Sequence, residues 1–221
     1  MSASLLSVHT GKVAPLGPEG VPSGFVKLAR PNAVAVRPEG LDGDAQADLS
    51  VHGGPDKAVY GYAADHYPRW AAEHPPHAAR FAPGAMGENL AIAGLDESAL
   101  CVGDIHRIGT ALLQVCQPRQ PCFKLGLRFE DPMMVRAMVQ NRRSGWYYRV
   151  LEPGRLQAGD RVTLQERPHP DFAFTRLVEI VYRRNPTQDE LERMAGLDGL
   201  ARQWRAQALR SLRERPETGQ G

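Results

Sequence analysis

The sequence is short of cysteine, and its three cysteines, Cys101, Cys116 and Cys122, are too few and too odd in number for a disulfide framework. This usage fits a reducing, cytoplasmic setting, which we expect for the protein. The seven histidines are scattered, and no two cysteines are close enough for a zinc ribbon. Dinucleotide-binding and P-loop glycine patterns are absent. No flavin or nicotinamide fingerprint and no iron–sulfur cysteine set is present either.

Long apolar runs and an excess of one charge are also missing. No window approaches the length of a membrane span, and the N-terminus lacks the charged region and apolar core of a signal peptide. We therefore expect neither a membrane nor a secreted location. The net charge is only +2, and no basic stripe with interleaved aromatics occurs, so nucleic-acid binding is not expected. A hydrophobic content of 42% leaves enough apolar surface for a sizeable core.

The first two-thirds of the chain is a series of short apolar segments between glycines and prolines. Many short strands with few helices are typical of a closed or nearly closed barrel. The predicted strands are 24–29, 33–37, 58–62, 89–92, 102–108, 111–116, 146–151 and 161–166. A helix is expected at 65–73, and a second helix follows Asp131, which can cap it, with Pro132 at its first position.

Helical patterns replace strands after residues 168–171. A helix is predicted at 174–184, a second opens with the capping box Thr187-Gln188-Asp189-Glu190, and Asp198 is the expected cap of a third. The predicted fold is therefore mainly β, with a β-barrel domain at 1–167, a small three-helix domain at 168–215 and a disordered tail at 216–221. The three helices are too few to be stable alone, so we expect them to pack on the barrel or on a partner.

One stretch carries the strongest chemical signal, Gln117-Pro-Arg-Gln-Pro-Cys-Phe-Lys-Leu125. Its prolines stiffen the turn after a buried strand, which holds the thiol of Cys122 in place. Arg119 and Lys124 are close in sequence, and nearby cations favour the thiolate, the form that attacks electrophiles and binds soft metals. A half-buried structural cysteine is the simpler alternative.

Three further candidates stand out. His52-Gly53-Gly54 could bring backbone N–H groups close to a ligand. Asn89, in Gly87-Glu-Asn-Leu90, can donate and accept hydrogen bonds at the edge of a heterocycle. Lys27 interrupts an apolar segment; it either faces solvent or points inward, where it needs an anion such as a phosphate.

Two known kinds of active site use a cysteine in this way. A zinc deaminase site is excluded, because Pro121-Cys122 has no second cysteine after it at the required spacing and no His-x-Glu before it. A cysteine protease would pair Cys122 with a histidine, most plausibly His52, and the sequence leaves that pairing open.

The order of these motifs resembles that of MOSC-domain proteins, and within them the bacterial YiiM type with a helical C-terminal extension. The similarity covers roughly residues 8–166. It rests on the segments already quoted, one of which continues as His52-Gly-Gly-Pro-Asp-Lys-Ala-Val59. It rests also on Gly103-Asp104 and Gly154-x-Leu-x-Ala-Gly-Asp160.

The resemblance implies a MOSC-type β-barrel that binds the molybdenum cofactor, a pterin whose dithiolene sulfurs hold molybdenum. Cys122 would then be the thiolate ligand of the metal. A thiolate is a soft ligand, which is chemically suited to this role. Lys27, Arg119 and Lys124 would face the phosphate or the negatively charged centre. His52, the Gly53-Gly54 backbone and Asn89 would line the pterin or the open metal face, with His52 as a catalytic proton donor.

The implied activity is reduction of small N-hydroxylated substrates, such as hydroxylaminopurine-type base analogues, to the amine. The expected partner is a separate flavin- or iron–sulfur-containing reductase, so NADPH alone should not support turnover. A homodimer is compatible with the sequence. Two alternatives stay open: a sulfur carrier with a persulfide on Cys122, and a non-catalytic molybdenum-cofactor-binding protein.

Overall fold

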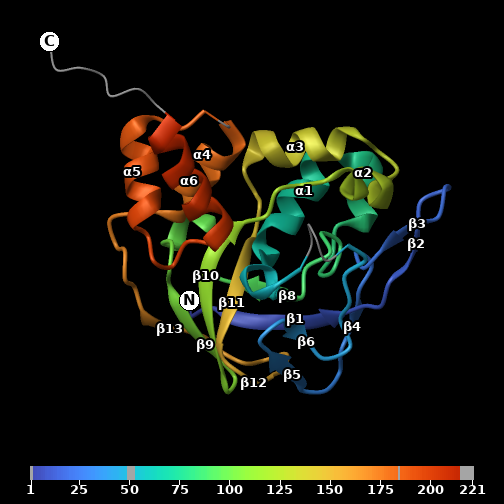
Figure 1. The fold of residues 1–221 in the computed structure, drawn as a ribbon. Helices are drawn as coiled ribbons and strands as arrows, with labels where there is room; N and C mark the ends of the chain where they lie inside the picture. Colours follow the sequence, from blue (N-terminus) through green and yellow to red (C-terminus); the bar gives the residue numbers. More distant parts are fainter. Residues whose placement is uncertain (1, 49–52, 184, 215–221) are drawn as a thin grey trace, which may run out of the picture.

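A curved sheet of eight strands forms the centre of the protein (Figure 1). The computed structural model describes residues 2–48, 53–183 and 185–214, so the predictions for His52 and for a disordered tail at 216–221 lie outside the described residues. The strand order is β13-β9-β10-β11-β7-β8-β1-β4, and the β7–β8 pair is parallel. The strands of this sheet are β1 (Ser4–Thr10), β4 (Leu28–Ala29), β7 (Val59–Ala63), β8 (Leu90–Ala93), β9 (Ile105–Ile108), β10 (Ala111–Pro118), β11 (Trp146–Glu152) and β13 (Val162–Glu166).

The sheet closes on itself through its first strand, β1. The sequence does not predict a strand there. The backbone N–H of Leu5 donates to Asp160 O at 2.9 Å, and Leu5 O accepts from Gly159 N at 2.8 Å. Val162 N, at the start of β13, donates to Ala3 O at 3.0 Å. These bonds join β1 to the segment that leads into β13, so the predicted mainly β barrel is confirmed.

Five shorter strands extend the barrel. They form a hairpin of β2 (Ala14–Leu16) with β3 (Val21–Ser23), and a small sheet ordered β12 (Gly154–Leu156), β5 (Val34–Arg37), β6 (Gly40–Leu41). The predicted strand at 24–29 is wrong for most of its length, because residues 24–27 form an irregular link between β3 and β4. Gly24 lets this link pass close to the backbone of residue 45, since a Cβ at position 24 would lie 1.9 Å from Ala45 O.

Six α-helices accompany the strands within the described residues. They are α1 (Tyr67–Glu73), α2 (Phe123–Phe129), α3 (Met133–Asn141), α4 (Phe174–Arg183), α5 (Gln188–Gly196) and α6 (Arg202–Glu214). The capping box at Thr187 is confirmed. Among these helices, none is both long and apolar enough to cross a bilayer.

The helices differ from the sequence predictions at three points. The sequence gave no sign of α2, which follows Cys122 directly. Helix α3 has Pro132 rather than Asp131 at its N-cap, although Asp131 Oδ1 still accepts from Met133 N at 2.8 Å. Helix α6 begins at Arg202, and Asp198 pairs with Arg205 at 2.8 Å instead of capping the helix.

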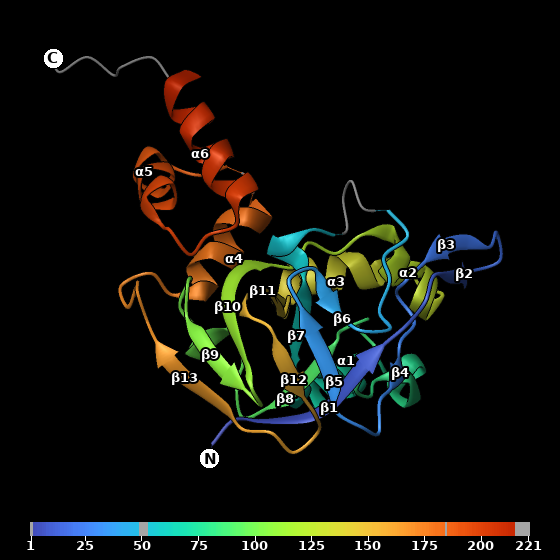
Figure 2. The same cartoon turned by 60° about the horizontal axis from the view of Figure 1, so that its bottom comes forward.

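The three C-terminal helices sit together at one end of the barrel, next to β10 and β11 (Figures 1 and 2). Buried side chains of α4 and α5 belong to the same hydrophobic cluster as those of the barrel strands. Two glycines also meet where the parts touch: a Cβ on Gly199 would lie 2.3 Å from the Cα of Gly103. The helices therefore pack on the barrel, and removing them would uncover part of its core.

Candidate active site

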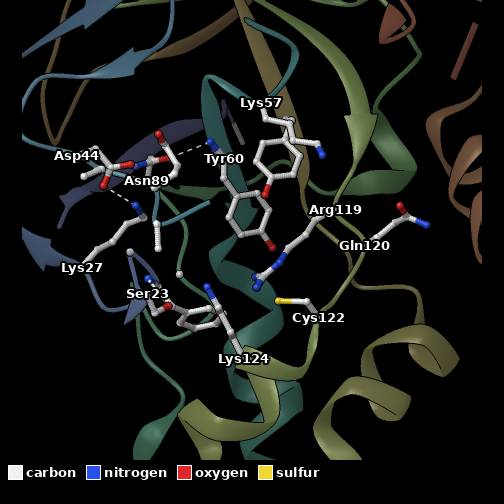
Figure 3. A pocket seen from close by; sticks show the side chains of 17 residues that line it. Ser23, Lys27, Asp44, Lys57, Tyr60, Asn89, Arg119, Gln120, Cys122 and Lys124 are labelled. Carbon is white, nitrogen blue, oxygen red and sulfur yellow. Dashed lines mark hydrogen bonds and ion pairs between the residues drawn. The ribbon is translucent and has the colours of Figure 1, made fainter. Parts of the chain in front are cut away.

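A pocket beside α2 gathers most of the predicted site residues (Figure 3). Its empty volume is about 680 Å³, part of it open to solvent. The predicted residues that line it are Lys27, Asn89, Arg119, Cys122 and Lys124. These residues are up to about a hundred positions apart in the sequence, so the fold brings them together.

Cys122 lies where the loop after β10 enters α2, with an extended backbone (φ −116°, ψ 170°). Its residue is half-buried, and its carbonyl accepts from Leu125 N at 3.0 Å. Figure 3 shows the sulfur pointing into the pocket, toward the Arg119 guanidinium, whereas Gln120 points away. The other two cysteines are buried and do not line this pocket. Cys122 is thus the thiol that the pocket presents to a ligand.

Arg119 is held in the pocket wall by aromatic faces and a carbonyl. Its guanidinium lies 5.0 Å from the ring centre of Phe25 and 4.9 Å from that of Tyr60, and it donates to Met86 O. Cation–π contacts of this kind gain strength when the cation is desolvated, and Arg119 is buried. The charge is therefore fixed in place before any ligand arrives.

Lys27 points inward and has its own carboxylate partner. Its ammonium pairs with Asp44, and the two side chains are 7% and 2% exposed. Burial lowers the pKa of Lys27, while Asp44 acts to raise it. The expectation that an inward Lys27 needs an anion is met by Asp44, which the sequence did not single out.

Asn89 holds this ion pair in position. Its Oδ1 accepts from Tyr60 N at 3.0 Å, and its Nδ2 donates to His9 O at 3.2 Å and to Asp44 Oδ2 at 2.9 Å. Both amide hydrogens and the oxygen are therefore used inside the protein. The predicted contact between Asn89 and a pterin is not tested by these bonds, which show a supporting role toward Asp44.

The two residues before Asn89 shape the loop that supports Arg119. Glu88 is fully buried and accepts from Tyr67 Oη at 2.5 Å and from Met86 N at 3.1 Å. Burial raises the pKa of Glu88, against the effect of these hydrogen bonds. Gly87 has φ 77°, and a Cβ there would lie 3.1 Å from Phe25 O. The Gly-Glu-Asn motif thus builds the pocket wall more than it faces the ligand.

The glycine-rich segment contributes a cation that the prediction overlooked. Gly53 and Gly54 are not among the lining residues, whereas Lys57, three positions on, is. Gly54 adopts φ 83° with open space around it, and its carbonyl accepts from Lys57 N at 2.9 Å. Lys57 lies in the quoted motif, so its charge was the signal that could have identified it. Burial lowers the pKa of Lys57, partly offset by Cys116 and Asp56.

The charges of the pocket are unequal. Among the described lining residues, four carry cationic side chains, Lys27, Lys57, Arg119 and Lys124, and one, Asp44, carries a carboxylate. Lys124 also donates to Pro22 O at 2.9 Å, which fixes α2 to the β2–β3 hairpin. The aromatic walls Phe25, Tyr60 and Tyr147 add flat apolar surface. Fold and site together define a β-barrel protein with a positively charged, thiol-bearing pocket suited to an anionic ligand.

Comparisons with known proteins agree with this class. Residues 48–163 match the MOSC domain, and residues 175–215 match the YiiM-like, 3-alpha helix domain. The chain is 38% identical to Protein YiiM of Escherichia coli over 90% of this chain and 88% of that protein. It is also 38% identical to a protein named Reductase from Gibberella moniliformis, over 82% of this chain and 32% of that protein.

Solved structures lead to the same family. The crystal structure of YiiM from Geobacillus stearothermophilus superposes with a TM-score of 0.79 at 31% identity, covering 95% of this chain and 99% of that one. The chain therefore belongs to the MOSC-domain family, in its YiiM-like branch with the three-helix domain.

Proposed function

We propose that the protein is an oxidoreductase that holds the molybdenum cofactor in this pocket and reduces N-hydroxylated compounds to amines. The observation that carries the proposal is the pocket-facing thiol of Cys122 amid four cations and one carboxylate in the part of the pocket that the structure describes. A soft thiolate suits molybdenum, and the cations suit the phosphate and the negatively charged centre of the cofactor.

The donor set fits a metal that brings most of its own ligands. Among the residues described, no three or more His, Cys, Asp or Glu side chains are grouped so that they could hold a metal ion. A bare ion would thus find at most Cys122 and Asp44 of these types among the described lining residues, whereas a dithiolene cofactor supplies further sulfur ligands. The donor set therefore favours a cofactor over a simple metal site.

When bound, the cofactor would supply the two electrons that break the N–O bond. The overall change is R–NHOH plus two electrons and two protons to R–NH₂ plus water. Lys27, Arg119 and Lys124 would bind and orient anionic groups, and the aromatic walls would exclude water from the reacting face. Lys57 is a candidate proton donor, because burial lowers its pKa relative to a lysine in solvent. His52 remains a second candidate.

A separate flavin- or iron–sulfur-containing reductase is the electron donor that we propose. The sequence itself carries no flavin, nicotinamide or iron–sulfur pattern from which electrons could come. One relative, from Gibberella moniliformis, is named Reductase, and the match covers 32% of its length.

Metal and pterin analysis of purified variants tests the proposal. Protein made in a host that synthesises the cofactor should carry molybdenum and pterin, and Cys122→Ser should lose most of the molybdenum. Cys101→Ser is the matched control, because Cys101 is a buried cysteine outside the pocket, and it should retain the metal.

Two results would contradict the cofactor site, and a third would contradict the activity. One is wild-type protein without molybdenum but with a persulfide on Cys122, which would favour the sulfur carrier. The other is equal molybdenum in wild type and Cys122→Ser. Cofactor retention without reduction of any N-hydroxylated compound, even with an artificial electron donor, would favour the non-catalytic binding protein.

A further inference from the structure

The loop that carries Cys122 is held from the side of the three-helix domain as well as from the barrel. Ala201 N, just before α6, donates to Cys116 O at 2.9 Å. Gln117 Oε1 accepts from Gln203 Nε2 at 2.9 Å and from Trp204 Nε1 at 3.1 Å. These bonds fix the end of β10, just before the loop, to the start of α6.

Tyr182, near the end of α4, reaches further along the same loop. Its hydroxyl donates to Arg119 O at 2.7 Å. Burial raises the pKa of Tyr182, so the hydroxyl stays protonated and able to donate. Arg119 is consequently held at both its side chain and its backbone. Met86 O and two aromatic rings contact the guanidinium, and the hydroxyl of Tyr182 in α4 donates to the carbonyl.

The hydroxyl of Tyr182 is not needed to dock the helices. The shared hydrophobic cluster and the contact of Gly199 with Gly103 already join the two parts. Asp56 adds an independent link, since its carboxylate accepts from Arg202 N at 2.8 Å and pairs with Arg149 at 2.7 Å. The Tyr182 bond differs from these contacts because it ends on the segment between Gln117 and Cys122.

We propose that Tyr182 is a positioning residue for the pocket thiol. Its hydroxyl fixes the peptide after Arg119, and this sets where the sulfur of Cys122 stands relative to the Arg119 charge. Trp204 and Gln203 contribute to the same task at Gln117. The three-helix domain is then part of the site. The inference deepens the proposed function and rests on it for the chemical role of the thiol.

The test uses the full-length protein without cofactor, so its result does not depend on molybdenum retention. A nitroxide spin label on Cys122 reports the mobility of the loop by electron paramagnetic resonance. The rate at which iodoacetamide alkylates Cys122, followed by peptide mass spectrometry, reports its accessibility. The buried Cys101 and Cys116 serve as internal references in the alkylation experiment.

Tyr182→Phe should give a more mobile spin-label spectrum and alkylation of Cys122 faster by about two- to twelvefold, the range expected for loss of one hydrogen bond. Trp204→Phe should have a smaller effect, because Gln203 still donates to Gln117. The matched control is Tyr148→Phe, which removes a buried tyrosine hydroxyl bonded to His106 Nδ1 at 2.8 Å.

Tyr148→Phe should leave the spin-label spectrum and the alkylation rate of Cys122 unchanged even where it lowers thermal stability. The proposal is overturned if Tyr182→Phe leaves both readouts at wild-type values. It is also overturned if Tyr148→Phe changes them as much as Tyr182→Phe does, because the effect would then follow global stability alone.

Discussion

Replacement of Asp44 by asparagine should be among the more destabilising single changes in the pocket. Asp44 accepts from Gly11 N and Asn89 Nδ2, each at 2.9 Å, and pairs with Lys27. The side chains of Asp44 and Lys27 are 2% and 7% exposed. Asp44→Asn leaves the Lys27 ammonium without its counter-ion, and breaking a buried pair in this way costs about 3–5 kcal/mol of unfolding free energy.

Urea denaturation measures this loss. With a slope of about 2 kcal/mol per molar urea, the midpoint should fall by roughly 1.5–2.5 M while the slope stays the same. The matched control is Asp42→Asn, which makes the same chemical change in the exposed pair of Arg37 and Asp42, whose side chains are 67% and 47% exposed. Surface pairs contribute little, so the control midpoint should hardly move.

The ionisation of Lys27 gives a second check on the same variant. Burial lowers the pKa of Lys27, and loss of Asp44 removes the effect that opposed it. The unfolded chain then binds more protons than the folded one between the folded and the ordinary lysine pKa, so the stability of Asp44→Asn should rise with pH across that window. The double variant Lys27→Met with Asp44→Asn should recover much of the loss. A cost for Asp44→Asn no larger than for Asp42→Asn would refute the reasoning.

Two further predictions concern the core and the pocket wall. Burial lowers the pKa of His106 from 6.5 to about 4, so the folded protein should lose stability as pH falls through this range. His106→Gln should therefore flatten the dependence of Tm on pH. Equal slopes of Tm against pH in wild type and His106→Gln would contradict this. Gly87→Ala should lower the unfolding free energy by about 1 kcal/mol or more, because its φ is 77° and Phe25 O stands 3.1 Å from the added Cβ. Gly196→Ala, in helix α5 with no atom within 4 Å of its Cβ, should be neutral or slightly stabilising when measured in the same urea titration.

The sequence predicted the barrel and the helical end because local patterns carry both. Short apolar segments between glycines and prolines mark β7 to β11, and the capping box at Thr187 marks α5. Strand β1 was missed, since its place is set by pairing with β8 and with the segment before β13, which are far away in sequence. Helix α2 was missed because its seven residues contain Gly126 and begin within a proline-rich turn.

The site residues divide in the same way, into those in a local motif and those placed by contacts between distant segments. Cys122, Arg119 and Lys124 were predictable because their motif is contiguous. Asp44 ends a glycine- and proline-containing segment without a chemical motif of its own, and only its contacts with Lys27 and Asn89 reveal its place in the pocket. The link from Tyr182 to Arg119 spans 63 positions and has no local signal. Tertiary contacts of this kind depend on the packed structure and leave little trace in one sequence.

The close approach of Gly103 and Gly199 couples the barrel and the helices sterically. Position 199 leaves no room for a side chain while Gly103 stays in place, because an added Cβ would lie 2.3 Å from the Cα of Gly103. A chimaera that joins the barrel of one relative to the helices of another should keep its thiol loop in order only when the helical part carries a glycine at position 199. The two parts are therefore not freely exchangeable modules, although each matches a separate domain family.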